Sequence, residues 1–181
     1  MKKSEECVYR TRMAGFTLVE LLVVIAVIAI LVTIGIPSFR DTIKNNRVTS
    51  HTNELLATLH FAKSEAVRRS APVDVRLRDI GAGWEASVFF PSGTSGTENC
   101  LRCSTNRRVS LQADDGTGLL DPPVMLLVFN SRGYLADSMS NLAVVPQVWL
   151  EHDECSGERQ RRRISILPSG QLLVANVGCS S

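Results

Sequence analysis

The stretch from Phe16 to Ile36 constrains this chain more than any other feature, because its only ionisable side chain is that of Glu20. A segment of about 20 residues that is apolar on all sides matches the hydrocarbon core of a bilayer. The sequence therefore predicts a transmembrane helix over residues 16–36.

The position of Gly15 separates this segment from a cleaved secretory signal. Such a signal has its small-residue cleavage site after the apolar run, whereas Gly15 stands before it. Cleavage after Gly15 would remove residues 1–15 as a leader and leave the helix in the mature chain, which would then begin at Phe16.

Glu20 is the second unusual feature of the segment. A carboxylate near the end of a membrane helix costs about 2–3 kcal/mol unless a cation compensates it. The new amino group of Phe16 would lie one helical turn away, either in the same chain or in a neighbouring copy. We interpret Glu20 as an assembly signal, the alternative being a plain signal anchor with an accidental acidic residue.

The segment Gly15-Phe16-Thr17-Leu18-Val19-Glu20-Leu21-Leu22, with Pro37 after the apolar run, resembles the class III signal of type IV pilins and type II secretion pseudopilins. This resemblance implies cleavage after Gly15 and N-methylation of Phe16 by a prepilin peptidase. It also implies that Glu20 forms a salt bridge with a neighbouring subunit. Residues 55–69 resemble the second half of the long helix in the FimT/GspH group, which includes FimU-like minor pilins.

The charges around the apolar run predict the orientation of the chain. The whole chain has 20 basic and 18 acidic residues, and four basic and two acidic ones belong to the leader, so 16 of each remain after cleavage. Basic residues before the run favour a cytoplasmic N-terminus, so we expect a single-pass inner-membrane protein with a periplasmic C-terminal domain before assembly. After assembly, the family resemblance implies a place in the pilus filament.

An amphipathic helix is expected to continue over residues 37–70. Gly35 and Pro37 predict a kink or a locally melted turn of the helix. The alternative is that Pro37 only bends the helix at the membrane surface. Pro72 predicts the end of the helix, and residues 39–47 form a polar neck. One apolar stripe recurs at steps of three and four residues: Val48, Thr52, Leu55, Leu59, Ala62 and Ala66.

Residues 71–181 are predicted to form a β-rich domain. The run Val124–Phe129 is continuously apolar and predicts a central strand covered on both faces, whereas Pro146 predicts an edge or a bulge within Leu142–Leu150. Loops are expected at 91–106 and 113–123. The other predicted strands are 73–78, 84–90, 108–112 and a hairpin of 163–167 with 171–177. The fold class is α+β, a long N-terminal helix packed across an antiparallel sheet.

Four cysteines would remain after cleavage, in a compartment where disulfides persist. The alternatives are a redox pair at Cys100 and Cys103, which lack the strand–helix context of such pairs, and a zinc site made by all four. We favour disulfides. Cys155 and Cys179 flank the terminal hairpin and would close its open end, which leaves Cys100 to pair with Cys103.

A basic run, Arg159 with Arg161, Arg162 and Arg163, suggests contact with nucleic acid. The FimT branch includes DNA-binding minor pilins that carry a Gly-Arg-x-Arg motif, but this chain has Gly170-Gln171-Leu172-Leu173 at the comparable place. Acidic residues lie directly upstream, and the mature chain is neutral, whereas DNA binders usually show a basic field. The alternative is a solvated strand edge that discourages aggregation.

The sequence contains no convincing catalytic motif, cofactor motif or metal site. His51, His60 and His152 are scattered, and Gly81-Ala82-Gly83 lacks the rest of a phosphate-binding loop. We therefore do not expect an enzyme. The resemblance to FimU-like subunits implies a minor pilin, which primes a type IV pilus at or near its tip and binds other pilins through its helix. The alternatives are a minor pseudopilin of a type II secretion system and a DNA-binding minor pilin for natural transformation.

Overall fold

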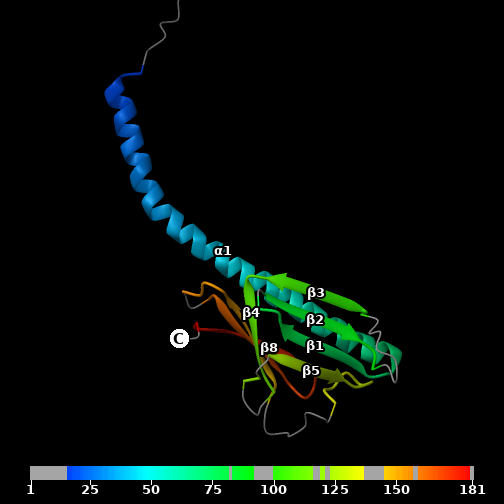
Figure 1. Ribbon diagram of the computed structural model, residues 1–181. Coiled ribbons are helices and arrows are strands. Elements are labelled where there is room, and N and C mark those ends of the chain that lie inside the picture. Colours follow the sequence, from blue (N-terminus) through cyan, green and yellow to red (C-terminus); the bar gives the residue numbers. More distant parts are fainter. Residues whose placement is uncertain are drawn as a thin grey trace, which may run out of the picture. The chain divides into compact units, whose positions relative to one another are not determined.

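The computed structural model describes residues 16–81, 83–91, 100–115, 119–120, 123–136, 145–156 and 159–179. These residues form one long helix followed by eight strands (Figure 1). The chain divides into two compact units, Met1–Arg40 and Asp41–Ser181, and the division falls within the helix.

The helix α1 runs from Leu18 to Arg69 and is unbroken through Gly35 and Pro37, so the local melt that the sequence suggested is not found. Its C-terminus is closed by Ser70, which adopts a left-handed conformation with φ of 51°. The Ser70 amide donates to the carbonyl of Val67, and the Ala71 amide to that of Ala66, both at 3.2 Å. These two bonds form a Schellman cap, which ends the helix just before Pro72 as predicted.

The apolar stripe predicted for the second half of the helix is confirmed. Its six residues are at most 1% exposed, and five of them belong to the hydrophobic core that the helix shares with the strands. The sixth, Thr52, satisfies its hydroxyl by donating to the Val48 carbonyl one turn earlier. The stripe therefore fixes which face of α1 packs on the strands.

The first sheet has four antiparallel strands in the order β3-β2-β1-β5. Their bounds are β1 Val73–Asp79, β2 Gly83–Phe89, β3 Arg102–Arg107 and β5 Val124–Phe129. Alternate residues of β1, β2 and β5 are buried, among them Leu77, Trp84 and Phe129. This alternation is the period of two expected when one face of a sheet covers a core.

The second sheet also has four antiparallel strands, in the order β4-β6-β7-β8. Their bounds are β4 Val109–Asp114, β6 Gln147–His152, β7 Arg161–Ile166 and β8 Leu172–Val177. Arg108, with φ of 65°, connects an edge strand of the first sheet to an edge strand of the second. The fold class is thus α+β as predicted, with two sheets in place of one.

Three predictions about the strands were wrong. The strand β3 lies where a loop was expected. The strand β5 is at an edge, and its side chains Val124 and Leu126 are over 40% exposed, so it is not covered on both faces. The strand β6 begins just after Pro146 and lies between β4 and β7, so Pro146 starts an interior strand and does not mark an edge. Residues 142–144 of that prediction lie outside the described residues.

The turn between β7 and β8 packs closely against two other segments. Lys63 of α1 donates from Nζ to the carbonyls of Ser169 and Gly170, at 3.2 and 3.0 Å. A Cβ added to Gly170 would lie 2.2 Å from the Gly133 carbonyl oxygen. The Leu135 amide also donates to the Pro168 carbonyl. The helix, the turn after β5 and the final hairpin are therefore held together at one place.

Candidate assembly site

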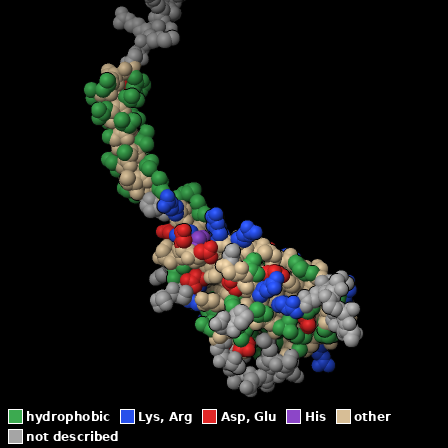
Figure 2. Space-filling model, viewed as in Figure 1, with side chains coloured by type: hydrophobic (Ala, Val, Ile, Leu, Met, Phe, Trp, Pro, Cys, Tyr) green, Lys and Arg blue, Asp and Glu red, His purple; other side chains and the backbone are tan. Residues whose placement is uncertain are grey.

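The N-terminal part of α1 is an exposed apolar rod. Its most apolar 18-residue window has a mean hydropathy of 3.0, and none of that window is buried within the protein. Hydrophobic side chains line its visible face (Figure 2). This helix is long and apolar enough to cross a membrane, and hydrophobic residues at this exposure require lipid or another protein around them.

Glu20 lies in the first turn of this rod. Its backbone amide donates to the Thr17 hydroxyl at 3.2 Å, and the Leu21 amide donates to the Thr17 carbonyl. Thr17 is therefore the N-cap, and Glu20 occupies the third helical position of a Thr-x-x-Glu capping sequence, where the helix dipole favours a negative charge. Within the described residues, the Glu20 carboxylate has no hydrogen-bond or ion-pair partner.

A shallow apolar groove lies further along the same unit. Gly35 contributes to it, because a Cβ at this position would meet nothing within 4 Å. The lining residues are Ile28, Leu31, Val32, Gly35, Ile36, Phe39 and Arg40. Among the described residues of this lining, Arg40 is the one that is charged, so the groove is almost wholly apolar.

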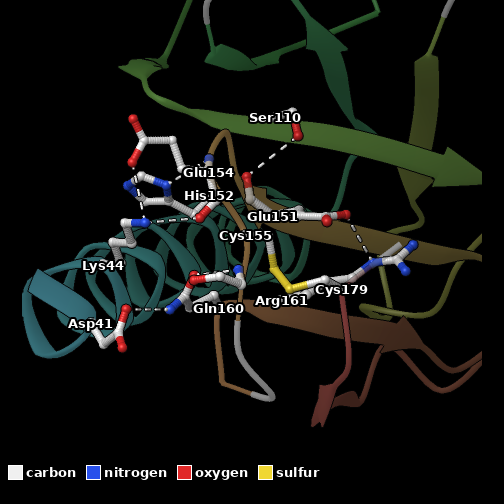
Figure 3. The surroundings of a disulfide bond; sticks show 11 residues. Asp41, Lys44, Ser110, Glu151, His152, Glu154, Cys155, Gln160, Arg161 and Cys179 are labelled. Atoms are coloured by element: carbon white, nitrogen blue, oxygen red, sulfur yellow. Dashed lines mark hydrogen bonds and ion pairs between the residues drawn. A yellow bond between two sulfur atoms is a disulfide. The ribbon is translucent and has the colours of Figure 1, made fainter. Parts of the chain in front are cut away.

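The base of the second half of α1 is tied to the turn between β6 and β7 by a clasp of four residues, Asp41, Lys44, Glu154 and Gln160 (Figure 3). Lys44 Nζ lies 3.1 Å from a carboxylate oxygen of Glu154 and donates to its carbonyl at 3.0 Å. Gln160, only 2% exposed, donates to Asp41 at 3.4 Å and accepts from the Ser156 amide. The polar neck thus has specific partners in the domain.

His152 lies beside this clasp and is buried. Its Nδ1 accepts a hydrogen bond from the Glu154 amide at 3.1 Å, which requires that nitrogen to be unprotonated. Burial lowers the pKa of His152, and the positive charges of Arg47 and Lys44 lower it further. The neutral imidazole therefore supports the clasp. Lys44 in turn lowers the pKa of Glu154, so the ion pair persists in its charged form.

The four cysteines of the domain form two disulfides, which are the pairings favoured from the sequence. Cys100 is joined to Cys103, and Cys155 to Cys179, with Cα–Cα distances of 6.0 and 5.8 Å. The second bond connects the clasp turn to the end of β8 (Figure 3). Glu151 lies near Cys155 and Cys179, but sulfur atoms in a disulfide are not thiolate ligands, and a four-cysteine zinc site is excluded by this pairing.

The basic run is divided between two faces of β7. Arg161 contacts Glu151 at 3.3 Å and Gln112 at 3.0 Å, and lies over the ring of Trp149. Arg162 points to the opposite face and donates to Thr49 of α1 at 2.9 Å. Because β7 lies between β6 and β8, the prediction of a solvated strand edge was wrong. The arginines do not form one basic face, since a strand alternates its side chains.

The family comparison agrees with this geometry. The family model "Type II transport protein GspH" matches residues 51–170, and the model "Prokaryotic N-terminal methylation motif" matches residues 10–36. The chain belongs to the GspH family. In this GspH-family protein the two matches cover the apolar segment with its flanks and most of the domain that follows.

Pilins are among the relatives that match part of this chain. A fimbrial protein of Pseudomonas aeruginosa is 38% identical over 87 residues, which are 45% of this chain and 55% of the relative. A type IV major alpha-pilin of Moraxella bovis is 46% identical over 106 residues, 59% of this chain and 65% of the relative. The chain thus spans somewhat over half the length of these relatives.

The structural comparison concerns the fold. The type IV minor pilin FimU of Pseudomonas aeruginosa superposes with a TM-score of 0.52 and 20% identity, over 72% of this chain and 89% of that one. A second crystal form of FimU gives a TM-score of 0.50. The long helix packed on antiparallel sheets therefore matches the pilin fold of FimU.

Some predicted site residues have a structural position and others do not. Gly15 lies outside the described residues, Phe16 directly precedes the N-cap, and Pro37 lies within the helix. Arg159 is exposed in the turn before β7. Sequence reasoning missed the role of Thr17, although the Thr-x-x-Glu spacing signals a capping box. It also missed the clasp, whose partners are about 110 residues or more apart in the chain.

Proposed function

We propose that this GspH-family protein is a minor pilin, inserted in the inner membrane with its C-terminal domain in the periplasm and then incorporated into a type IV pilus. Its role there is to prime assembly at or near the tip, through contacts with other pilins and without catalysis. The observation that carries the proposal is the exposed apolar rod whose single carboxylate, Glu20, has no partner within the described residues.

The apolar rod and its carboxylate act in contacts between subunits. Cleavage after Gly15 by a prepilin peptidase creates a positively charged amino group on Phe16. In a bundle of identical or related helices, that group or its counterpart on a neighbour compensates Glu20 and fixes the register between subunits. The apolar groove around Gly35 then receives side chains of the adjacent helix.

Replacing Glu20 with valine tests the assembly role. We expect E20V protein to remain in the membrane, because the helix becomes more apolar, while its amount in sheared filaments falls at least tenfold. Thr33→Val is the matched control, because it removes another polar group from the same helix. Among the described residues, the Thr33 hydroxyl donates only to the Ile30 carbonyl of its own helix. Equal incorporation of E20V and wild-type protein would refute the role of Glu20.

Mass spectrometry of the N-terminus tests the processing step. We expect the mature protein to begin with N-methylated Phe16, and Gly15→Leu to leave the leader attached. A wild-type protein that still begins at Met1 would contradict the proposal at its first step.

A minor pseudopilin of a type II secretion system is the second candidate, favoured by the name of the matching family model. Deleting the gene distinguishes the two: loss of surface pili with normal secretion of exoenzymes supports the pilus, and the reverse supports the secretion system. DNA uptake through the arginines is a third hypothesis. Unchanged retardation of duplex DNA after Arg161→Gln, Arg162→Gln and Arg163→Gln would remove it.

A further inference from the structure

The outer edge of β8 is an open edge of the second sheet. The order of that sheet places β8 beside β7 only, and no described residue forms a backbone hydrogen bond to its other side. Its sequence, Leu172–Val177, contains neither a charged residue nor a proline. Edge strands are usually protected by charges, prolines or covering segments, because an unpaired edge accepts a strand from another chain.

The hydrogen-bonding pattern identifies which residues face the open edge. The Leu167 amide donates to the Gln171 carbonyl at 2.9 Å, at the start of the hairpin. Since antiparallel ladders alternate, the backbone groups of residues 173, 175 and 177 point to β7. Those of Leu172, Val174 and Asn176 therefore point away from β7 and present amides and carbonyls in strand spacing.

The other three edge strands are protected in ways that β8 is not. The strand β5 pairs with the segment after it, through the bridge of Phe129 to Leu135 and the bond from the Ala136 amide to the Val128 carbonyl. The strand β4 pairs similarly with Leu119 and Leu120. The strand β3 begins and ends with arginines. Among the described residues, β8 alone combines an unpaired edge with an uncharged sequence.

The side chains of β8 favour an apolar strand as the occupant. Leu173 is 50% exposed on one face and Val174 is 41% exposed on the other, next to the buried Ile164. A strand added at this edge would cover both, since neighbouring strands lie about 4.8 Å apart and cross-strand side chains contact each other. The core of the second sheet would then extend by one strand.

The positive charge of Arg163, next to β8, favours an acidic residue in the added strand. Arg163 pairs across the ladder with Ala175, so only a methyl group lies between its side chain and the open edge. Its Nε is buried, and it has no hydrogen-bond or ion-pair partner within the described residues. A carboxylate opposite Ala175 on an added strand would lie within reach of this guanidinium, a pairing that arginine makes well.

We propose that the edge of β8 is a docking site for an extended segment of another protein subunit, apolar in alternate positions and with a carboxylate opposite Ala175. The segment pairs with the backbone groups of Leu172, Val174 and Asn176 and extends the second sheet by β-augmentation. This contact uses only the Asp41–Ser181 unit, so it is independent of the helix-mediated assembly proposed above.

The test measures binding of synthetic peptides to the full chain in detergent micelles, by fluorescence anisotropy. The probe is a labelled eight-residue peptide of alternating valine and threonine with one central glutamate. We expect saturable binding that weakens at least tenfold when alternate backbone amides of the peptide are N-methylated. It should weaken severalfold when the glutamate is replaced by lysine.

Two protein variants locate the site. Val174→Pro removes an outward-facing amide without touching the ladder to β7, and should weaken binding at least tenfold; Val174→Thr retains that amide and should bind normally. Arg163→Gln should remove the preference for glutamate over lysine. Circular dichroism and unfolding midpoints check that the variants fold.

Three outcomes would overturn the proposal. The first is no saturable binding up to about 1 mM peptide, the weak end of specific recognition. The second is binding that Val174→Pro leaves unchanged. The third is a stable dimer of the full chain that Val174→Pro dissociates, because the occupant would then be a second copy.

Discussion

The contact between the final hairpin and the turn after β5 gives the sharpest stability prediction, through Gly170→Ala. Gly170 has φ of +69°, which costs a residue with a Cβ about 1–2 kcal/mol. Its added Cβ would also meet the Gly133 carbonyl oxygen at 2.2 Å, so one of the two turns must move. That movement weakens the two bonds from Lys63, each worth about 1 kcal/mol. We expect Gly170→Ala to lower the free energy of unfolding by about 3–4 kcal/mol.

Gly81→Ala separates the backbone strain from the collision. Gly81 has a similar φ of +79°, but an added Cβ there would meet nothing within 4 Å. This variant should therefore cost only the left-handed strain, about 1–2 kcal/mol. Gly133→Ala is intermediate, because its Cβ would contact the flexible side chain of Lys63 and the side chain of Val67 at 3.1 Å.

Urea unfolding of the full chain in micelles, followed by tryptophan fluorescence, measures these differences. Trp84 of β2 is fully buried in the core, with its ring against that of His51 of α1, and reports the loss of the core. The midpoints should fall in the order wild type, Gly81→Ala, Gly133→Ala, Gly170→Ala. If Gly170→Ala and Gly81→Ala were equally destabilised, the close packing of the two turns would be wrong.

Three further predictions concern the covalent bonds, the helix cap and pH. Replacing Cys155 and Cys179 by serines should lower the free energy of unfolding by about 3.5 kcal/mol, and replacing Cys100 and Cys103 by only about 1.6 kcal/mol. These values follow from the loop entropies at sequence separations of 24 and 3. Thermal unfolding measures both. Ser70→Gly should stabilise by about 0.5–1 kcal/mol, because φ of 51° suits glycine, and a lower urea midpoint would contradict this. The pKa of His152 in the folded protein lies below its ordinary value of 6.5. The stability that neutral His152 contributes is therefore complete above pH 6.5 and is lost as the pH falls towards the folded pKa. His152→Asn should flatten this dependence of the free energy of unfolding on pH, measured by unfolding across a pH series.

The helix and its packing face were predictable because their signal is periodic and local. The stripe from Val48 to Ala66 repeats over several turns, and the helix face that this spacing predicts is the one that is buried. The strands with alternating apolar residues, β1 and β2, were predictable for the same reason. In each case the apolar residues whose spacing predicts the element are also the residues that it buries in the core.

The strand β3 was missed because it has no such signal. Its sequence is Arg-Cys-Ser-Thr-Asn-Arg, and Ser104 is its one buried residue. It is a strand because β2 supplies its hydrogen bonds and because Asn106 donates to Glu54 of α1 at 2.7 Å. The misplacement of β5 has the opposite cause, since a continuous apolar run does not reveal that one face stays exposed.

The clasp at the base of α1 could not be predicted because its partners come together only in the folded domain. Lys44 and Glu154 are 110 residues apart, and each is typical of a solvated surface in its own segment. The same holds for Arg162, whose partner Thr49 lies 113 residues away. Polar residues without a period carry no information on whether water or a distant side chain will satisfy them.

The final hairpin, β7 with β8, is held at both of its ends. At its turn, Lys63 and the Gly133 segment hold it; at its open end, the disulfide from Cys155 to Cys179 ties β8 to the turn that carries Glu154. Both ends of the hairpin are thus attached to α1, one directly and the other through the clasp. A strand bound at the edge of β8 would therefore act on an element fixed to the helix, not on a loose C-terminus. We expect reduction of that disulfide, in a Cys100→Ser/Cys103→Ser background, to weaken peptide binding, because an untied β8 frays at its end.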